Sequence, residues 1–176
     1  MMKMNFQQLI DNDINEAYEL LCERIEDLKS NGINQYDKVY PPFELFFKRQ
    51  VDKENYGLYD NGLLAIVSLM KNYVPEGWKE EIKSKNFVWL TSLFVKLSMK
   101  RKNIGSIIIE KIYNWAKNEK INEIYLDCYY GNGFLENYYT LFGYKRIVKK
   151  LVEYPSHKFE AVLMKNDIFT YNNILS

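Results

Sequence analysis

The sequence predicts a mixed α/β fold in which one central sheet is flanked by helices. Two observations lead to this fold class: short apolar runs bounded by turn residues alternate with segments whose apolar residues recur every three to four positions. The chain has 176 residues, enough to bury a single core, and no repeat or linker divides it. We therefore expect one domain over residues 1–176.

Caps and turn residues mark the elements of the first half. Asp13 can cap the first helix, Glu16 three residues later completes a capping-box pair, and Gly32 can end the helix. Asn61-Gly62 tolerates the positive φ that a tight hairpin turn requires. The expected elements are a strand near 5–10, a helix between Asp13 and Gly32, a helix over 43–52, and hairpin strands over 56–59 and 63–70.

The second half alternates strands and helices after a polar segment at 71–86. The run at 87–97 is among the most apolar of the chain and predicts a buried strand. An apolar stripe with a polar opposite face predicts an amphipathic helix over 104–118, and Gly143 suits the C′ position of a shorter helix. The remaining elements are a strand over 121–129, a helix between Asn132 and Phe142, and strands over 145–153 and 159–165 that are joined near Pro155.

Composition narrows the function classes. With 24 basic and 23 acidic residues the formal net charge is +1, so no general attraction to nucleic acid or to an anionic membrane is expected. No apolar run is long enough to span a bilayer. Two cysteines, Cys22 and Cys128, and one histidine are too few for a zinc site, so no metal is expected. The cysteines fit small buried residues in a reducing compartment, which predicts a cytoplasmic protein.

The first candidate site is the junction between the strand at 87–97 and the helix at 104–118. Amide groups at a helix start point outward and attract anions. Gly105 allows a close backbone approach, Asn103 tolerates left-handed geometry, and three basic residues add positive charge. An ordinary turn with a solvated basic cluster is the other interpretation. The candidate pyrophosphate-binding residues are Lys100, Arg101, Lys102, Asn103, Ile104, Gly105 and Ser106.

The second candidate site follows the strand at 121–129. Asp127 lies near the end of that strand, and Asn132 opens the next helix. Asn132 and Tyr139 are seven residues apart, close to two helical turns, so they share one helix face. Gly143 and Tyr144 then close the helix. Taken alone, these tyrosines fit core residues equally well.

Together and in this order, the two segments resemble the GNAT N-acetyltransferase superfamily. Its signature after the fourth strand is Gln/Arg-x-x-Gly-x-Gly/Ala, and here Lys100, Asn103 and Gly105 occupy those three positions. Asn132, Tyr139 and the Gly143-Tyr144 pair match the second family motif without a gap. The resemblance implies a twisted mixed sheet of about six to seven strands that opens between the fourth and fifth strands. It also implies acetyl transfer from acetyl-CoA to a primary amine by direct attack in a ternary complex.

The resemblance assigns roles to particular residues. The backbone of the fourth strand, at Leu93, Phe94 and Val95, would pair with the pantetheine amides, and the amides of 101–106 would hold the pyrophosphate. Asn132 would bind the pantetheine arm, and Tyr139 would protonate the departing thiolate. Many members carry a glutamate on the fourth strand, whereas this chain has Trp89-Leu90-Thr91-Ser92. Asp127 and His157 are the available general bases.

The acceptor and the partners are less strongly marked. The acceptor pocket is expected to include Tyr36, Tyr40, Phe43 and Trp89, with His157 as a further substrate-side residue. A small-molecule amine is the leading acceptor. The alternatives are a catalytically silent acyl-CoA sensor, and an acetyltransferase that acts on a protein amino terminus or charged tRNA. Apolar residues of the tail predict a possible homodimer: Ile168, Phe169, Tyr171, Ile174 and Leu175.

Overall fold

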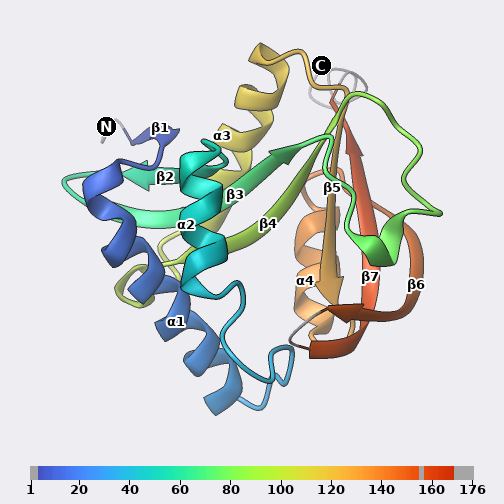
Figure 1. Cartoon of the computed structure of the whole chain (residues 1–176), viewed down its shortest axis with the longest axis horizontal. Coiled ribbons are helices and arrows are strands. Elements are labelled where there is room, and N and C mark those ends of the chain that lie inside the picture. The colour runs from blue at the N-terminus through green and yellow to red at the C-terminus, as the bar shows by residue number, and fades with distance from the viewer. Residues whose placement is uncertain (1–3, 155–156, 169–176) are drawn as a thin grey trace. The chain divides into compact units, whose positions relative to one another are not determined.

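The structure, a computed structural model, describes residues 4–154 and 157–168. Seven strands form one mixed sheet in the order β1-β2-β3-β4-β5-β7-β6 (Figure 1). The strands are β1 (Asn5–Gln8), β2 (Asn55–Tyr59), β3 (Leu63–Lys71), β4 (Phe87–Val95), β5 (Glu123–Tyr129), β6 (Lys145–Tyr154) and β7 (His157–Asp167). The helices are α1 (Ile14–Ser30), α2 (Phe43–Val51), α3 (Ile104–Asn118) and α4 (Gly133–Thr140). The predicted order of elements and the mixed α/β class are confirmed.

Strand pairing confirms the predicted hairpin. The hairpin strands β2 and β3 are antiparallel, as are β6 and β7, and β5 pairs antiparallel with β7. β4 and β5 are parallel, and their ladder joins Phe87–Trp89 to Glu123–Tyr125 only. Each of these two strands continues beyond its last paired residue. The opening that the sequence analysis expects between the fourth and fifth strands stays a prediction.

The predicted capping box at the first helix is wrong. Asp13 does occupy the N-cap position, but its side chain makes no capping hydrogen bond. A short 3-10 turn, Asp11–Asp13, runs directly into α1, and Asp13 has φ −94° and ψ 2° instead of the extended backbone that capping needs. Glu16 pairs with Lys96 instead, at 3.0 Å.

The fourth strand ends two residues earlier than predicted, at Val95, because a 3-10 turn follows at Leu97–Met99. A second 3-10 turn, Glu76–Trp78, lies in the segment predicted only as polar. The glycine and asparagine predictions hold at three turns, since Gly32, Asn61, Gly62 and Gly143 all have positive φ.

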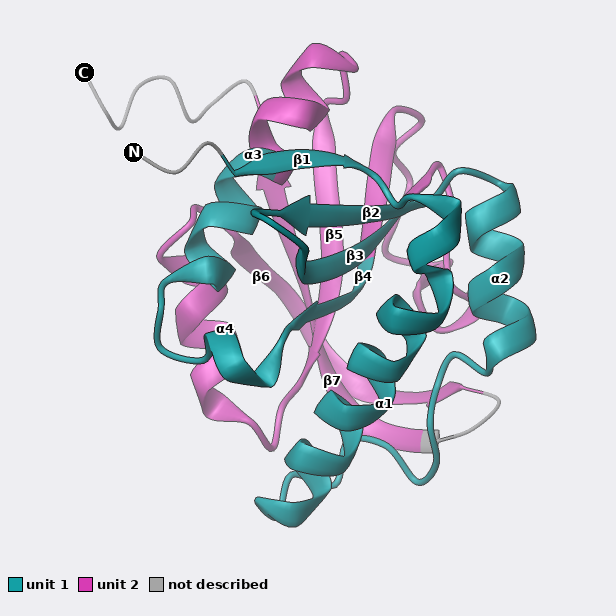
Figure 2. Cartoon of the chain, turned by 90° about the vertical axis from the view of Figure 1, so that its left-hand side faces the viewer, with its two compact units in different colours: residues 1–69, 91–111 teal, residues 70–90, 112–176 magenta. Residues whose placement is uncertain are grey.

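The chain divides into two compact units, coloured separately in Figure 2. Unit 1 comprises residues 1–69 and 91–111, and unit 2 comprises residues 70–90 and 112–176. The single domain expected from the sequence stays a prediction.

Unit 1 is built around α1 and α2, which lie against each other (Figure 1). Tyr18 of α1 contacts the ring of Phe43 edge-on, at a centroid distance of 5.1 Å. Apolar positions of α1 at helical spacing face the sheet, as the sequence pattern predicts. The buried core residues of this unit are Leu9, Ala17, Leu20, Leu21, Ile25, Phe46, Leu63, Ile66 and Phe94.

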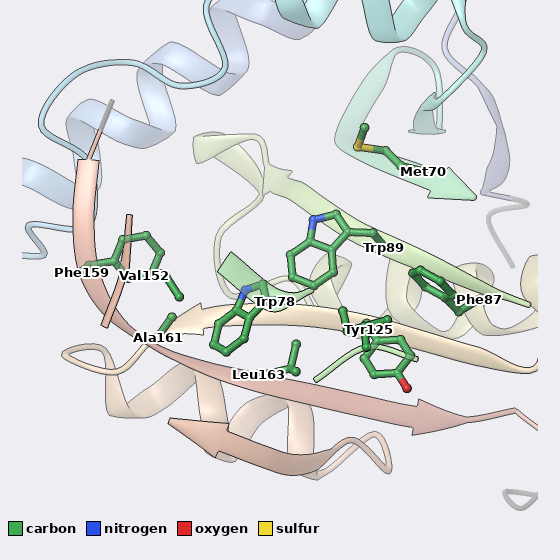
Figure 3. Close-up of a cluster of buried hydrophobic side chains, with 10 residues drawn as sticks. Met70, Trp78, Phe87, Trp89, Tyr125, Val152, Phe159, Ala161 and Leu163 are labelled. Carbon is green, nitrogen blue, oxygen red and sulfur yellow. The ribbon is translucent and has the colours of Figure 1, made fainter. Parts of the chain in front are cut away.

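Unit 2 has an aromatic core (Figure 3). Trp78 is completely buried, and the rings of Phe87 and Tyr125 meet edge-on at 5.4 Å. Trp78 therefore anchors the segment between β3 and β4 on the face of β5 and β7. The buried members of this cluster, called here the aromatic cluster, are Met70, Trp78, Ile82, Phe87, Trp89, Tyr125, Val152, Phe159, Ala161 and Leu163.

Three further sequence expectations can be compared with the structure. In the described part of the chain, no helix is both long and apolar enough to cross a membrane. Cys22 and Cys128 are free thiols, and burial raises the pKa of Cys128 to about 12. Ile168 is buried, and its carbonyl accepts a hydrogen bond from Tyr113 Oη at 2.6 Å, so it offers no free surface. The other tail residues named for a dimer interface lie outside the described residues.

Candidate functional site

The loop before α3 in unit 1 has the backbone geometry of an anion-binding site. Arg101 and Asn103 have φ of 63° and 61°, in the left-handed region that occurs in anion-binding loops, and the Lys102 N–H between them donates to Met99 C=O at 3.3 Å. The first helical hydrogen bond of α3 joins Ile107 N–H to Asn103 C=O, and the amides before it point out of the helix start. The predicted tolerance of Asn103 for left-handed geometry is confirmed. The loop can hold a phosphate-like anion.

The three basic residues of this loop are not equivalent. Arg101 and Lys102 are exposed, whereas Lys100 Nζ lies 2.8 Å from both carboxylate oxygens of Asp27 on α1. Asp27 also pairs with Arg24, at 2.5 Å. The hydrogen bond from Lys100, with help from Arg24, lowers the pKa of the Asp27 carboxyl. Lys100 therefore ties the loop to α1, and Arg101 and Lys102 supply the charge that faces solvent.

β4 carries a strained residue in its interior. Ser92 has φ 54°, which a non-glycine residue in a strand rarely adopts and which costs on the order of 1 kcal/mol or more. Its hydroxyl accepts a hydrogen bond from Arg49 Nη1 at 3.3 Å, and Arg49 is only 6% exposed. The strained position directly precedes Leu93 to Val95, the stretch whose backbone was predicted to pair with pantetheine.

Asp127 in unit 2 lies in the interior of β5, two residues before the strand ends. Trp78 Nε1 donates to its Oδ2 at 2.9 Å, and Tyr154 Oη donates to the same oxygen at 2.5 Å. Burial raises the pKa of the Asp127 carboxyl, although the hydrogen bonds from Tyr154 and Trp78 oppose that change. The residue still keeps partial solvent exposure. A buried carboxyl with a raised pKa, on a residue that is itself partly exposed, is a candidate to accept a proton near neutral pH.

Tyr139 lies on α4, whose N-cap is Asn132, as the spacing predicted. The Tyr139 ring is 8% exposed and meets the Tyr144 ring at 5.5 Å and the Tyr138 ring at 5.8 Å. Asn132 is partly exposed and makes no side-chain capping hydrogen bond. Gly143, with φ 85°, ends the helix and returns the chain to β6. The packing of the ring sets the direction of the Tyr139 hydroxyl.

Comparison with known proteins decides the family. The acetyltransferase (GNAT) family matches residues 15–144, about three quarters of the chain. The chain belongs to this family. No curated protein matches it significantly.

Solved GNAT structures share the fold at low sequence identity. An acetyltransferase of the GNAT family from Streptococcus agalactiae superposes with a TM-score of 0.77 at 12% identity, over 93% of this chain and 95% of that one. One from Listeria monocytogenes gives 0.75 at 16% identity, over 93% and 94%. The ribosomal-protein-S18-alanine N-acetyltransferase of Escherichia coli gives 0.67 at 15% identity, over 94% of each chain.

The residues predicted for the acceptor side of this acetyltransferase fall in different surroundings. Tyr36 packs against the core of unit 1, and its hydroxyl accepts a hydrogen bond from Gln35 Nε2 at 3.1 Å. Tyr40 is half-buried, and Phe43 is 36% exposed. Trp89 is buried in the aromatic cluster of unit 2. The side chain of His157 lies outside the described part of the structure.

The sequence analysis missed the polar partners of the site residues in this acetyltransferase. Arg49 could have been found, because it lies three positions after Phe46 and so shares the buried face of α2. Trp78 stands alone in a polar segment, which marks it as an anchor but gives no partner. Tyr154 gives no sequence signal for its contact with Asp127.

Proposed function

We propose that this GNAT protein is an acetyl-CoA-dependent N-acetyltransferase that acetylates the primary amine of a small molecule by direct transfer in a ternary complex. The observation that carries the proposal is Asp127. β4 lacks the carboxylate that many family members use, and Asp127 on β5, a partly exposed residue, provides a carboxyl whose pKa is raised by burial. A protein with the fold but no base would be expected to lack such a group, which favours an enzyme over an acyl-CoA sensor.

The residues present fit acetyl-CoA. The left-handed residues Arg101 and Asn103 and the start of α3 form a backbone cradle of the kind that binds phosphate groups. Ile104, Gly105 and Ser106 form the first turn of α3, and Arg101 and Lys102 add exposed positive charge. Leu93 to Val95 of β4 would pair with the pantetheine arm, and Asn132 would bind it. A Salmonella typhimurium protein of the same fold, 10% identical and with a TM-score of 0.68, was solved with its cofactor acetyl-CoA.

In the proposed mechanism, Asp127 and Tyr139 each have one chemical role. Acetyl-CoA, when bound, supplies the acetyl group and leaves as the thiol. Asp127 accepts the proton that the acceptor ammonium must lose before the amine can attack. Tyr139 donates a hydrogen bond, and then a proton, to the departing sulfur, because a phenol with a reference pKa near 10 stays protonated at neutral pH. No metal has a task in this scheme.

The surroundings of Asp127 support a compact acceptor. Trp78 and Ile82 bury the segment between β3 and β4 in the aromatic cluster, and Asp127 keeps only partial exposure. A small amine needs less access than a folded protein with an amino-terminal tail.

Two free thiols fit a reducing compartment, and a cytoplasmic location is part of the proposal.

Acetyl-CoA is expected to stabilise the protein against heat. A ligand that binds only the native state adds RT ln(1 + [L]/Kd), about 2.7 kcal/mol at ~100 Kd, which for a chain of this size raises Tm by roughly 5–10 °C. The experiment is a thermal-shift series with acetyl-CoA, CoA and dephospho-CoA, followed by thiol release over a panel of small amines and amino-terminal peptides. No shift at millimolar acetyl-CoA would remove the proposal. A shift without turnover would favour the sensor, and turnover on peptides alone would favour a protein acceptor.

Gly105→Val is expected to abolish acetyl-CoA binding while the fold persists. Gly105 lies in the helical first turn of α3, so its backbone geometry suits valine as well. Valine has a helix propensity at least equal to that of glycine, so stability should not fall. The branched side chain would instead obstruct the pyrophosphate. Gly105→Ala is the graded control; wild-type affinity in Gly105→Val, measured by calorimetry, would remove the phosphate site from this turn.

A further inference from the structure

Two neutral donors hold one oxygen of Asp127. Trp78 lies in the 3-10 turn between β3 and β4, and Tyr154 is the last residue of β6, so the donors come from different elements of unit 2. Both distances, 2.9 Å from Nε1 and 2.5 Å from Oη, are those of strong hydrogen bonds to a carboxyl. Both bonds end on Oδ2.

We propose that Trp78 and Tyr154 are positioning residues for catalysis: their hydrogen bonds to Oδ2 fix the Asp127 side chain and leave Oδ1 to take the proton of the acceptor amine. This inference rests on the proposed function, because it assigns the two residues to the base of that reaction. It goes further by naming the carboxylate oxygen that accepts the proton and the side chains that position it and adjust its pKa.

Each donor is itself held in place. The ring of Trp78 is completely buried, and Lys150 Nζ lies 4.9 Å from its centroid while pairing with Glu81 at 2.5 Å. Tyr154 stacks on Phe159 with a centroid distance of 5.9 Å and an interplanar angle of 22°. Rigid donors can keep a carboxyl in one rotamer, which a flexible donor cannot.

The side-chain groups that most strongly lower the pKa of Asp127 are the two donors, Tyr154 and Trp78. Lys150 of β6 lies over the Trp78 ring and pairs with Glu81 of the segment before β4. On β5 the neighbouring titratable residue is Cys128, whose pKa is raised, and on β7 Leu163 is the paired residue opposite Asp127. Among the described side chains, no Lys or Arg forms an ion pair with Asp127. Burial raises the pKa of Asp127, and the hydrogen bonds from Tyr154 and Trp78, together with one from the Asp127 backbone, lower it.

Tyr154→Phe tests the inference through the pH dependence of kcat/KM. The substitution removes one hydroxyl that favours the ionised carboxylate, so the pKa of Asp127 should rise further. The acidic limb of the profile should then move to higher pH by about one unit, the scale of one hydrogen bond to a charged group. Activity should fall most at low pH and recover toward the wild-type rate at high pH. A uniform loss at all pH values, with an unmoved limb, would show a merely structural role and overturn the inference.

Tyr129→Phe is the matched control. Tyr129 is on β5, packs against the same aromatic cluster and meets Phe159 edge-on at 5.9 Å, but its hydroxyl is not bonded to Asp127. In the pH dependence of kcat/KM of Tyr129→Phe, the acidic limb should stay at the wild-type position. If Tyr154→Phe does not fold, Trp78→Phe removes the other donor and should move the limb in the same direction; an unmoved limb there contradicts the inference equally.

A second measurement separates this inference from the proposed function. The carboxyl carbon of Asp127 can be titrated by NMR in the protein without ligand, in the wild type and in Tyr154→Phe. The inference requires a higher Asp127 pKa in the variant, and equal values would overturn it. Absence of turnover in the wild type, with the titration shift present, would contradict the proposed function while leaving the control of Asp127 by Tyr154 established.

Discussion

Tyr139→Phe is expected to lower kcat by on the order of 100-fold or more, the usual scale for one positioned proton donor. The affinity for acetyl-CoA should stay within a few-fold, because the ring that packs against Tyr144 and Tyr138 is kept. The loss arises because the departing sulfur no longer receives a proton from the phenol. Single-turnover rates and calorimetric titration with acetyl-CoA measure the two quantities separately.

Tyr138→Phe is the matched control for this prediction. Tyr138 is adjacent on α4 and is also in an aromatic group, with Phe134 stacked at 5.4 Å and Phe142 edge-on at 5.1 Å. Its loss of a hydroxyl should leave kcat near the wild-type value. Unchanged turnover in Tyr139→Phe would make Tyr139 a packing residue and leave the family assignment intact.

Asp127→Asn is expected to lower kcat/KM by roughly 10²- to 10⁴-fold, the range for loss of a general base, with acetyl-CoA affinity retained. Its effect on stability follows from the raised pKa. The pKa of this carboxyl is higher in the folded state than in the unfolded state, so the carboxyl destabilises the fold once pH exceeds the unfolded-state pKa. The wild type therefore loses stability as pH rises from the unfolded-state pKa to the folded-state pKa. The variant lacks this dependence. Denaturant unfolding between pH 4 and pH 8 checks the sign, and thiol release checks the rate.

His157→Ala is the comparison for Asp127→Asn, since the histidine was the other candidate base. If His157 supplies the base, its variant should lose turnover and Asp127→Asn should retain it. The opposite pattern is expected here, because Asp127 combines a raised pKa with partial exposure.

Local signals were enough to predict the elements. The apolar stripe of α3 and the turn residues Gly32 and Gly143 act within a few positions of the chain, so the helices and their ends follow from neighbouring residues. The capping-box prediction was wrong because capping depends on the backbone conformation of Asp13, and a preceding 3-10 turn determines that conformation. Residue types alone could not indicate that turn.

The site was predictable where it depends on backbone, and less so where it depends on distant side chains. Asn103 is a residue type that tolerates left-handed geometry, whereas the same geometry at Arg101 has no signal in the sequence. Asp127 was identified, but its partners Trp78 and Tyr154 are 49 and 27 positions away. Such contacts are set by strand order and by the packing of an irregular segment, which no local pattern records.

The ion pair between Lys100 and Asp27 bears on the entropy of cofactor binding. A basic loop that is loose in the free protein must lose conformational freedom when it closes on a ligand, and that loss weakens affinity. Here the Lys100 ammonium forms an ion pair with Asp27 of α1, and Asp27 also pairs with Arg24. This ion pair restrains one end of the loop in the protein without ligand. If the loop holds the pyrophosphate as proposed, the lysine at the first position of the family signature would contribute to affinity as an anchor that preorganises the cradle, without contact between its charge and the phosphates.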